Sequence, residues 1–280
     1  MTRIALWMLV GCLTAAVYAS EQIPEGRDLS ADQIVEKNIA ARGGLDAWRK
    51  IQTMVWVGHV DSANTPSDEL PFALALKRPN KTRFEMTVLN QRAVRVFNGK
   101  QGWKVSPSAT GGGEARPYTM DELKSAHDEQ VIDGLLIDHQ AKGVDVTLDG
   151  IDKVDGHDAY RLAVKLPSGV TRHVWVDAQS FLDVKYDRAA RGPRGPVTVE
   201  VKYSDYKDVE GLQIPFTIES GAAAAGKRDK LTIDKVSLNP PLDDTMFAKP
   251  ASQGWHNSVS VNAEPSPSPP MPAALSRTSP

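Results

Sequence analysis

Apolar and polar residues alternate with a period of two in a series of short runs that begins at Phe72 and ends at Ile233. In one such run, Val144, Val146 and Leu148 alternate with acidic or hydroxyl residues. This alternation is typical of β-strands that bury one face and expose the other. Turn signals such as Asn98-Gly99 separate the runs, and such short connections make neighbouring strands pair antiparallel. The pattern predicts a mainly β fold of about 11–12 strands in one strongly curved antiparallel sheet with its apolar face inward.

The stretch before the first run has the signals of a helix. Ser30 is followed three residues later by Gln33, which is the spacing of a capping box. Apolar residues then recur on roughly one side of residues 31–41, and two glycines at 43–44 end the pattern. Residues 45–51 are predicted to form another short helical turn. The folded part of the chain is therefore expected to start with a helix.

A second helical stretch interrupts the strands in mid-chain. Thr119 and Glu122 repeat the capping-box spacing, and residues 120–141 carry a loose apolar side that includes Leu135. Gly134 is expected to bend or split this element. Because the open apolar face of the curved sheet is the available surface for an amphipathic helix, both helical stretches are predicted to cover that face.

The two ends of the chain differ in composition from the middle. Arg3 and an apolar stretch over residues 4–18 form the layout of a secretory signal peptide, with cleavage predicted after Ala19. Residues 251–280 are rich in Ser and Pro and lack apolar periodicity, so they are predicted to be disordered. We therefore divide the chain into a signal peptide (1–19), a folded domain (20–250) and a Pro/Ser-rich tail (251–280).

The only cysteine, Cys12, lies in the signal-like segment. Residues 9–12 resemble a lipobox, the site at which bacterial lipoproteins are cleaved and acylated. Cleavage there would leave almost no apolar region before it, so cleavage after Ala19 and export to the periplasm are favoured. A membrane-anchored lipoprotein, attached through Cys12, is the alternative. A chain cleaved after Ala19 has no cysteine and forms no disulfide.

Composition and motifs indicate no catalytic chemistry. With a net charge of −2, 41% hydrophobic and 24% charged residues, the chain has an ordinary globular composition and no basic excess that would indicate nucleic acid. The six histidines are scattered without the spacing of a metal site, and no Gly-x-Ser-x-Gly pattern supplies a nucleophile. The glycines at 111–113 lack the Lys-Ser/Thr of a phosphate-binding loop. The sequence therefore predicts no enzyme activity, no metal and no cofactor.

The alternating pattern alone leaves the use of the interior open, because such a sheet either fills its interior with side chains or encloses an apolar ligand. Four phrases, however, resemble the periplasmic lipoprotein-carrier superfamily, which includes the outer-membrane lipoprotein-sorting proteins: residues 155–162, 174–182, 205–216 and 240–247. The resemblance covers roughly residues 30–250. It implies a half-closed β-barrel with a helical lid and a hydrophobic cavity that takes acyl chains. The Pro/Ser-rich tail departs from the family pattern.

The resemblance implies a non-catalytic function. It indicates periplasmic binding or carriage of a lipid or a lipidated protein, as a chaperone in lipoprotein transport, with a partner protein of the inner or outer membrane. Two alternatives stay open: an envelope sensor or protein-interaction module of the same fold, and an integral outer-membrane β-barrel. The two helical stretches, the aromatic content of 6% and the polar end of the chain argue against the last of these.

The residues expected to line the cavity are the apolar side of each alternating run together with two leucines of the lid. A slip of one residue in any strand would move its residues to the other face. The candidate ligand residues are Phe72, Leu74, Leu76, Phe84, Met86, Val94, Val96, Trp103, Leu135, Leu136, Leu162, Val164, Val174, Val176, Val199, Val201 and Phe216.

Overall fold

The computed structural model describes residues 29–62, 69–107, 113–129, 132–192, 195–223 and 228–251. The expected signal peptide and all but the first residue of the expected tail lie outside these residues. The helical elements of the described part are α1 (Ala31–Ala41), α2 (Leu45–Lys50), α3 (Met120–Asp128) and the short 3-10 helix η1 (Asp244–Phe247). No helix in this part of the chain is both long and apolar enough to cross a membrane.

The strands form one 13-stranded antiparallel sheet, so the predicted mainly β, curved antiparallel fold is confirmed. The first and last strands pair with each other in the middle of the sheet, while β6 and β7 are its two edges, and the sheet is not closed. The strands are β1 (Thr53–Asp61), β2 (Leu70–Lys77), β3 (Lys81–Val88), β4 (Gln91–Phe97), β5 (Gly102–Val105), β6 (Arg116–Pro117), β7 (Asp145–Val154), β8 (His157–Lys165), β9 (Thr171–Asp177), β10 (Asp183–Gly192), β11 (Gly195–Val209), β12 (Leu212–Ala222) and β13 (Asp229–Leu238).

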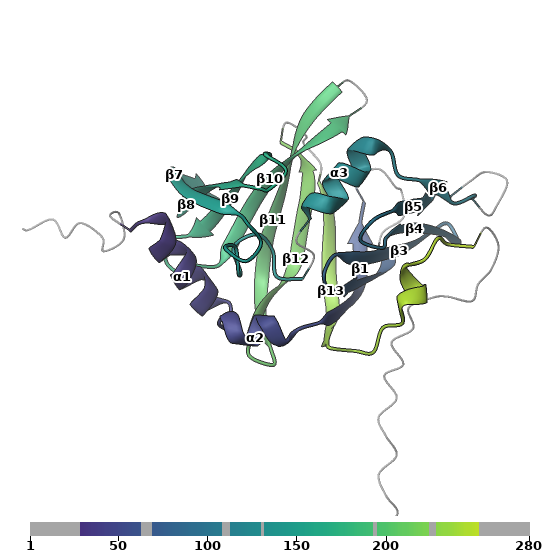
Figure 1. The fold of residues 1–280 in the computed structure, drawn as a ribbon, viewed down its shortest axis with the longest axis horizontal. Helices are drawn as coiled ribbons and strands as arrows, with labels where there is room; N and C mark the ends of the chain where they lie inside the picture. The colour runs from purple at the N-terminus through teal and green to yellow at the C-terminus, as the bar shows by residue number, and fades with distance from the viewer. Residues whose placement is uncertain are drawn as a thin grey trace, which may run out of the picture.

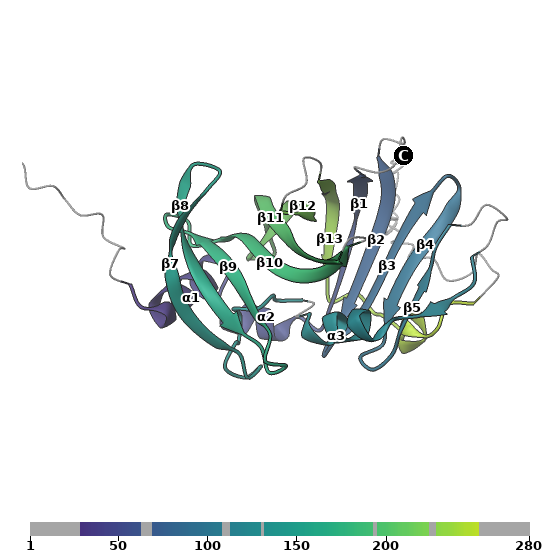
Figure 2. The ribbon, with the colours of Figure 1, turned by 90° about the horizontal axis from the view of Figure 1, so that it is seen from above.

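The sheet is bent into a trough. Figure 1 shows α1 and α2 beside the half of the sheet that contains β7–β12 and α3 beside the other half. Figure 2, seen from above, shows β7–β9 as one wall and β2–β5 as the other, with α2 and α3 between the walls. We call the face that contacts α1, α2 and residues 132–143 the inner face, and the opposite face the outer face.

The inner face carries two apolar clusters that meet near α1. In the first cluster, Trp48 and Ile51 of the α2 region pack on strands β1, β2, β12 and β13. In the second, Ile34 and Val35 of α1 pack on β7–β9 together with Leu136. Burial of these side chains is the main favourable contribution to folding in a chain of this kind. The clusters fix the helices to the inner face, as the sequence predicts.

The outer face of β1–β5 is also apolar, contrary to the expectation of one wet face. Val55, Val94 and Val96 form a cluster there with Phe247 of η1. The segment around η1 is also held by polar contacts, because Arg83 Nη1 donates to the Met246 carbonyl at 2.7 Å. The chain thus covers part of its own outer face with the turn η1.

Both predicted capping boxes are present, but only the first predicted helix extends over its expected length. Ser30 caps α1 and Thr119 caps α3, each with the reciprocal side-chain bond. The prediction of a helix over 120–141 is wrong in its second half, because α3 ends at Asp128 and residues 132–143 form turns. Gly134 and Asp138 have φ angles of +75° and +53°, and this left-handed backbone cannot continue an α-helix.

Candidate functional site

A group of half-buried apolar side chains lies on the inner face of β1–β3 and of the neighbouring β12 and β13. Leu74 of β2 lies directly opposite Phe84 of β3, and Phe72 lies opposite Met86. The rings of Phe72 and Phe84 stack with their centroids 5.7 Å apart. We call the half-buried apolar side chains of this region the apolar wall; its members are Trp56, Leu74, Phe84, Met86, Val88, Ile218 and Leu231.

Most of the residues predicted from the sequence as cavity-lining lie on the inner face, in two groups. Those of the first cluster are Phe72, Leu74, Leu76, Phe84, Met86 and Phe216. Those of the second cluster are Leu135, Leu136, Leu162, Val164, Val174 and Val176. Val201 pairs directly with Tyr186 and Val199 with Arg188 on the adjacent strand. Their role in ligand binding stays a prediction.

Three of the predicted residues lie on the outer face of the sheet. Val94, Val96 and Trp103 belong to the outer-face cluster around Phe247. Arg95, between the two valines, is the residue that lies opposite Phe84 on the inner face. The prediction took the apolar side of β4 for the ligand side, but in this strand the apolar side is covered by η1.

Sequence reasoning missed β1 and its contribution to the apolar wall. Met54 belongs to the inner-face cluster and Val55 to the outer-face cluster, so both faces of this strand are apolar and the period-two signal is lost. Trp56 follows on the inner side, and its indole Nε1 is buried without a hydrogen-bond partner. A continuous apolar run over 54–57 is typical of a strand buried on both faces. This run is the signal in the sequence from which β1 could have been predicted.

Residues 132–143 cross the inner face as an inner segment held by ion pairs. Buried Asp133 accepts from Arg78 Nη2 at 2.6 Å, and its carbonyl accepts from Arg42 Nη1 at 3.0 Å. Asp138 receives two hydrogen bonds from Arg49 of α2, at 2.8 and 2.9 Å. Because its anchors belong to α1, α2 and the β2–β3 turn, the inner segment is a fixed part of the interior.

The helix α3 is attached in a different way. None of its residues is buried, and Met120 is 80% exposed. Glu122 accepts from Lys104 Nζ at 2.8 Å and from Arg95 Nη2 at 3.1 Å. Burial alone would raise the pKa of Glu122, but the hydrogen bonds from Lys104 and the Thr119 backbone, with the charge of Arg95, lower it to about 2. The helix is therefore held to the sheet mainly by polar contacts.

A buried polar cluster joins α1 to β10. Asp183 accepts from Asn38 Nδ2 and from Arg42 Nη1, both at 3.0 Å, and its carbonyl accepts from the Tyr206 hydroxyl at 2.7 Å. Burial raises the pKa of Asp183, and the Arg42 charge and the Asn38 hydrogen bond oppose this rise. These contacts attach the C-terminal end of α1 to β10.

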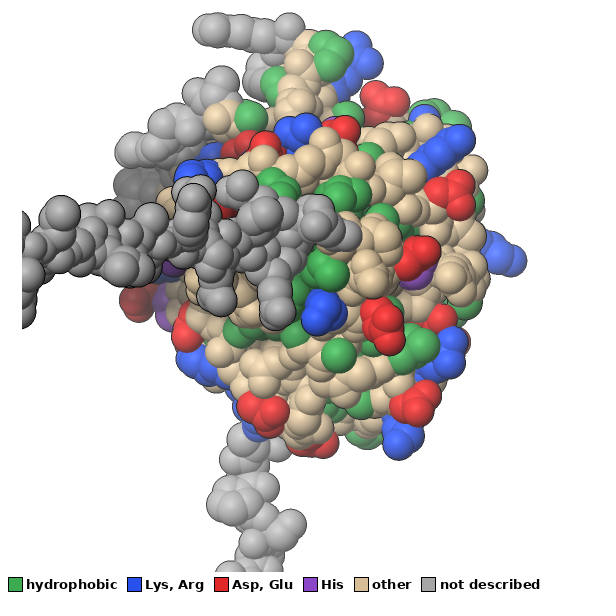
Figure 3. Space-filling view, turned by 90° about the vertical axis from the view of Figure 1, so that its left-hand side faces the viewer, with side chains coloured by type: hydrophobic (Ala, Val, Ile, Leu, Met, Phe, Trp, Pro, Cys, Tyr) green, Lys and Arg blue, Asp and Glu red, His purple; other side chains and the backbone are tan. Residues whose placement is uncertain are grey.

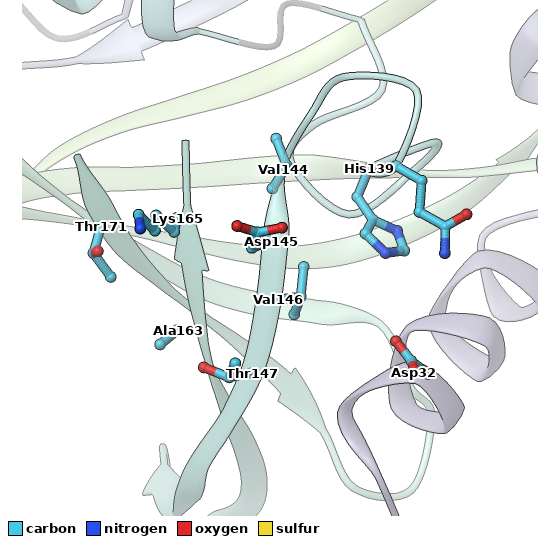
Figure 4. A pocket seen from close by; sticks show the side chains of 10 residues that line it. Asp32, His139, Val144, Asp145, Val146, Thr147, Ala163, Lys165 and Thr171 are labelled. Carbon is cyan, nitrogen blue, oxygen red and sulfur yellow. The ribbon is translucent and has the colours of Figure 1, made fainter. Parts of the chain in front are cut away.

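Two hollows of the described structure lie near these elements. The larger, about 630 Å³, lies at the β7 edge (Figure 4). Asp32, His139 and Val146 lie on one side of β7, and Lys165 and Thr171 lie on the other, so this hollow wraps around an edge strand. Figure 3 shows the same end of the molecule with hydrophobic side chains dispersed among charges of both signs. The smaller hollow, about 60 Å³, lies under the start of the inner segment. Within the described residues, no group of three His, Cys, Asp or Glu side chains could hold a metal ion.

Comparison with known proteins identifies the fold. No family model and no curated protein matches the sequence. Among solved structures, a LolA superfamily protein from Nitrosomonas europaea is similar, with 16% identity, a TM-score of 0.52, and coverage of 79% of this chain and 98% of that one. A DUF1329 family protein from Desulfovibrio piger has 12% identity and a TM-score of 0.49, with coverage of 78% and 97%. A domain assigned to outer membrane lipoprotein sorting, from Vibrio parahaemolyticus, has 12% identity and a TM-score of 0.49, with coverage of 76% and 94%.

Proposed function

We propose that the protein binds and carries a lipid, or the acyl chains of a lipidated protein, against its inner face without catalysing a reaction. Its fold, which is that of a LolA superfamily protein, supports the proposal and agrees with the resemblance of the sequence to the lipoprotein carriers. The observation that carries the proposal is the apolar wall: half-buried side chains on the inner face of an open sheet whose outer face the chain itself covers in part.

The physical basis is the removal of acyl chain from water. Each methylene buried contributes roughly 0.8 kcal/mol, so even part of a chain laid along Leu74, Phe84 and Met86 gives useful affinity. These side chains lie in register on β2 and β3, which makes a continuous apolar strip. Non-directional contacts of this kind accept acyl chains of different lengths, as a carrier requires.

Access to the wall depends on α3. This helix lies beside β5 and buries none of its own residues. An exposed ion pair contributes only up to about 1 kcal/mol, so the contacts of Glu122 can break and re-form at low cost. We therefore propose that α3 is the lid, and that α1 and the inner segment form the floor.

The proposal includes the setting of the protein. The signal-peptide pattern at residues 1–19 supports export and a periplasmic function. Cargo would then be taken up from one membrane and released at another, which requires a partner protein at the inner or outer membrane. A sensor that uses the same fold would bind its ligand on the same wall, so the identity of the bound ligand separates the two.

The test is purification of the protein from a bacterial periplasm, followed by solvent extraction and mass spectrometry. We expect stoichiometric phospholipid or acylated peptide in the wild-type protein and its loss in Phe84→Glu, which places a charge on the apolar wall. Leu89→Glu is the matched control, because Leu89 is 73% exposed and lies at the β3–β4 turn. Circular dichroism checks that both variants fold. A ligand-free wild type that also binds no fluorescent fatty acid would refute the carrier function.

A further inference from the structure

A buried arginine lies on the inner face of β9, in a row that is otherwise apolar. Arg172 is 4% exposed, and the next residues on the same side of the strand are Val174 and Val176, both buried. On the adjacent strand β8, Arg172 lies opposite Val164. Burying a guanidinium among valines is strongly unfavourable unless it is paired and hydrogen-bonded. The inner face therefore contains a cation whose burial requires a counter-ion.

The counter-ion that the described part of the chain provides is Glu129, which pairs with Arg172 at long distance and is partly exposed to solvent. Glu129 Oε1 lies 3.5 Å from Arg172 Nη1, and the Glu129 side chain is 38% exposed. Charge-assisted hydrogen bonds between a guanidinium and a carboxylate are typically about 2.7–2.9 Å long. Glu129 is also the residue that follows α3, the helix with no buried side chain. An anion that approaches Arg172 more closely can therefore replace Glu129.

The small hollow of about 60 Å³ lies at this arginine. Leu135 and Leu136 line one side, and Tyr186 and Tyr203 line another, with their rings stacked 5.9 Å apart. Asp183 also lines the hollow, but its carboxylate already accepts hydrogen bonds from Asn38 and Arg42. Burial raises the pKa of both tyrosines, so their hydroxyls stay protonated and can donate hydrogen bonds. Since a water molecule takes roughly 30 Å³ of liquid volume, the hollow has room for one small anionic group and not for a chain.

We propose that this hollow receives the anionic head of the acyl ligand, a carboxylate or a phosphate, which replaces Glu129 as the counter-ion of Arg172. The inference rests on the proposed function, because the chain attached to that head must lie along the inner face. The hydroxyls of Tyr186 and Tyr203 complete the set of donors, and Leu135 and Val174 contact the start of the chain. The site therefore selects acids over neutral esters of the same chain.

The test compares parinaric acid, a fluorescent fatty acid, with its methyl ester on the purified full-length protein. Arg172→Met keeps an unbranched side chain without the charge; we expect binding of the acid to weaken by about tenfold to a hundredfold and binding of the ester to stay unchanged. Glu129→Gln removes the competing carboxylate, so we expect it to strengthen binding of the acid. Lys153→Met, on an exposed side chain of β7, is the control for a general loss of charge.

The outcomes separate this site from the proposed function. If Arg172→Met weakens binding of the acid and of the ester equally, or leaves binding of both unchanged, the head-group site is refuted while acyl binding stands. If the wild type binds neither probe, acyl binding itself is refuted, and the site with it. Competition by inorganic phosphate identifies the source of the anion. If phosphate displaces parinaric acid at concentrations similar to those at which the acid binds, the site takes free anions, and its assignment to a lipid head group is overturned. Should Arg172→Met fail to fold, the absence of tighter binding in Glu129→Gln refutes the site alone.

Discussion

Replacing Phe247 by alanine tests whether the outer face of the sheet is part of the core or part of the ligand surface. Phe247 is fully buried, and its cluster contains Val55, Ala75, Val94 and Val96. Because the outer face under η1 is core, Phe247→Ala should destabilise the fold and leave ligand binding intact. If the ligand instead binds to the outer face, where two valines of the predicted cavity lie, the same substitution lowers affinity.

The magnitude follows from the burial of the ring. A buried Phe→Ala change typically costs about 3–5 kcal/mol through lost transfer energy and the cavity that it leaves. Because η1 is a single turn outside the sheet, it can partly collapse into the space or detach, which places the expected loss at the low end, about 3 kcal/mol. Detachment has its own cost, since Lys77 and Lys81 both pair with Asp244 at 2.8 Å.

The assay is equilibrium unfolding in urea followed by tryptophan fluorescence, because Trp103 packs on this cluster. Met120→Ala is the control: that side chain is 80% exposed, and the expected change is within about 0.5 kcal/mol. A loss below about 1 kcal/mol for Phe247→Ala would mean that η1 does not cover the outer face as described. Weaker binding of a fatty-acid probe at unchanged stability would restore Val94 and Val96 to the ligand surface.

Three further predictions address other contacts. Since the pKa of Glu122 is lowered from 4.5 to about 2, attachment of α3 should be complete above pH 4.5 and be lost as the pH falls toward 2. Hydrogen exchange of the α3 amides measures this attachment. In Glu122→Gln the exchange should be fast at every pH. Asn38→Ala removes the donor to the Phe181 carbonyl and to Asp183, and it should lower the free energy of unfolding in urea by about 1–3 kcal/mol. Asn38→Asp should lower it further, because this change buries a second carboxylate. Equal losses for the two variants would contradict this reasoning. Gly58→Ala would place a Cβ 2.0 Å from the Thr232 carbonyl and should lower stability by about 1–3 kcal/mol in thermal unfolding, and a neutral result would exclude the close approach of β1 and β13.

Strands with one wet and one apolar face could be recognised from the sequence, because their alternation directly reflects burial. β8 is an example: Tyr160, Leu162 and Val164 are buried, and Arg161 and Ala163 between them are less so. The helix starts were equally readable, since a capping box depends only on residues three apart. These local signals supply most of the sheet and both helix N-termini.

The sequence could not show where burial depends on distant contacts. β1 is apolar on both faces because it lies at the centre of the sheet between the inner clusters and η1, so its pattern has no period. Arg172 stands among alternating residues like any exposed arginine, and only the fold places it in the interior. The turns over 132–143 depend on Asp133, whose partners Arg42 and Arg78 are far away in sequence.

The covers of the two faces differ in how firmly they are attached, and this difference decides which one opens. The outer cover buries Phe247 completely, so removing it exposes apolar surface. The inner cover over β5 is α3, which buries no residue and is held by the ion pairs of Glu122, worth up to about 1 kcal/mol each. Glu129 follows α3 directly, so movement of the helix away from the sheet also withdraws the counter-ion of Arg172. In the proposed carrier, movement of α3 and loss of the counter-ion of Arg172 are therefore one event, and an anionic amphiphile that pairs with Arg172 would stabilise the state in which α3 has moved.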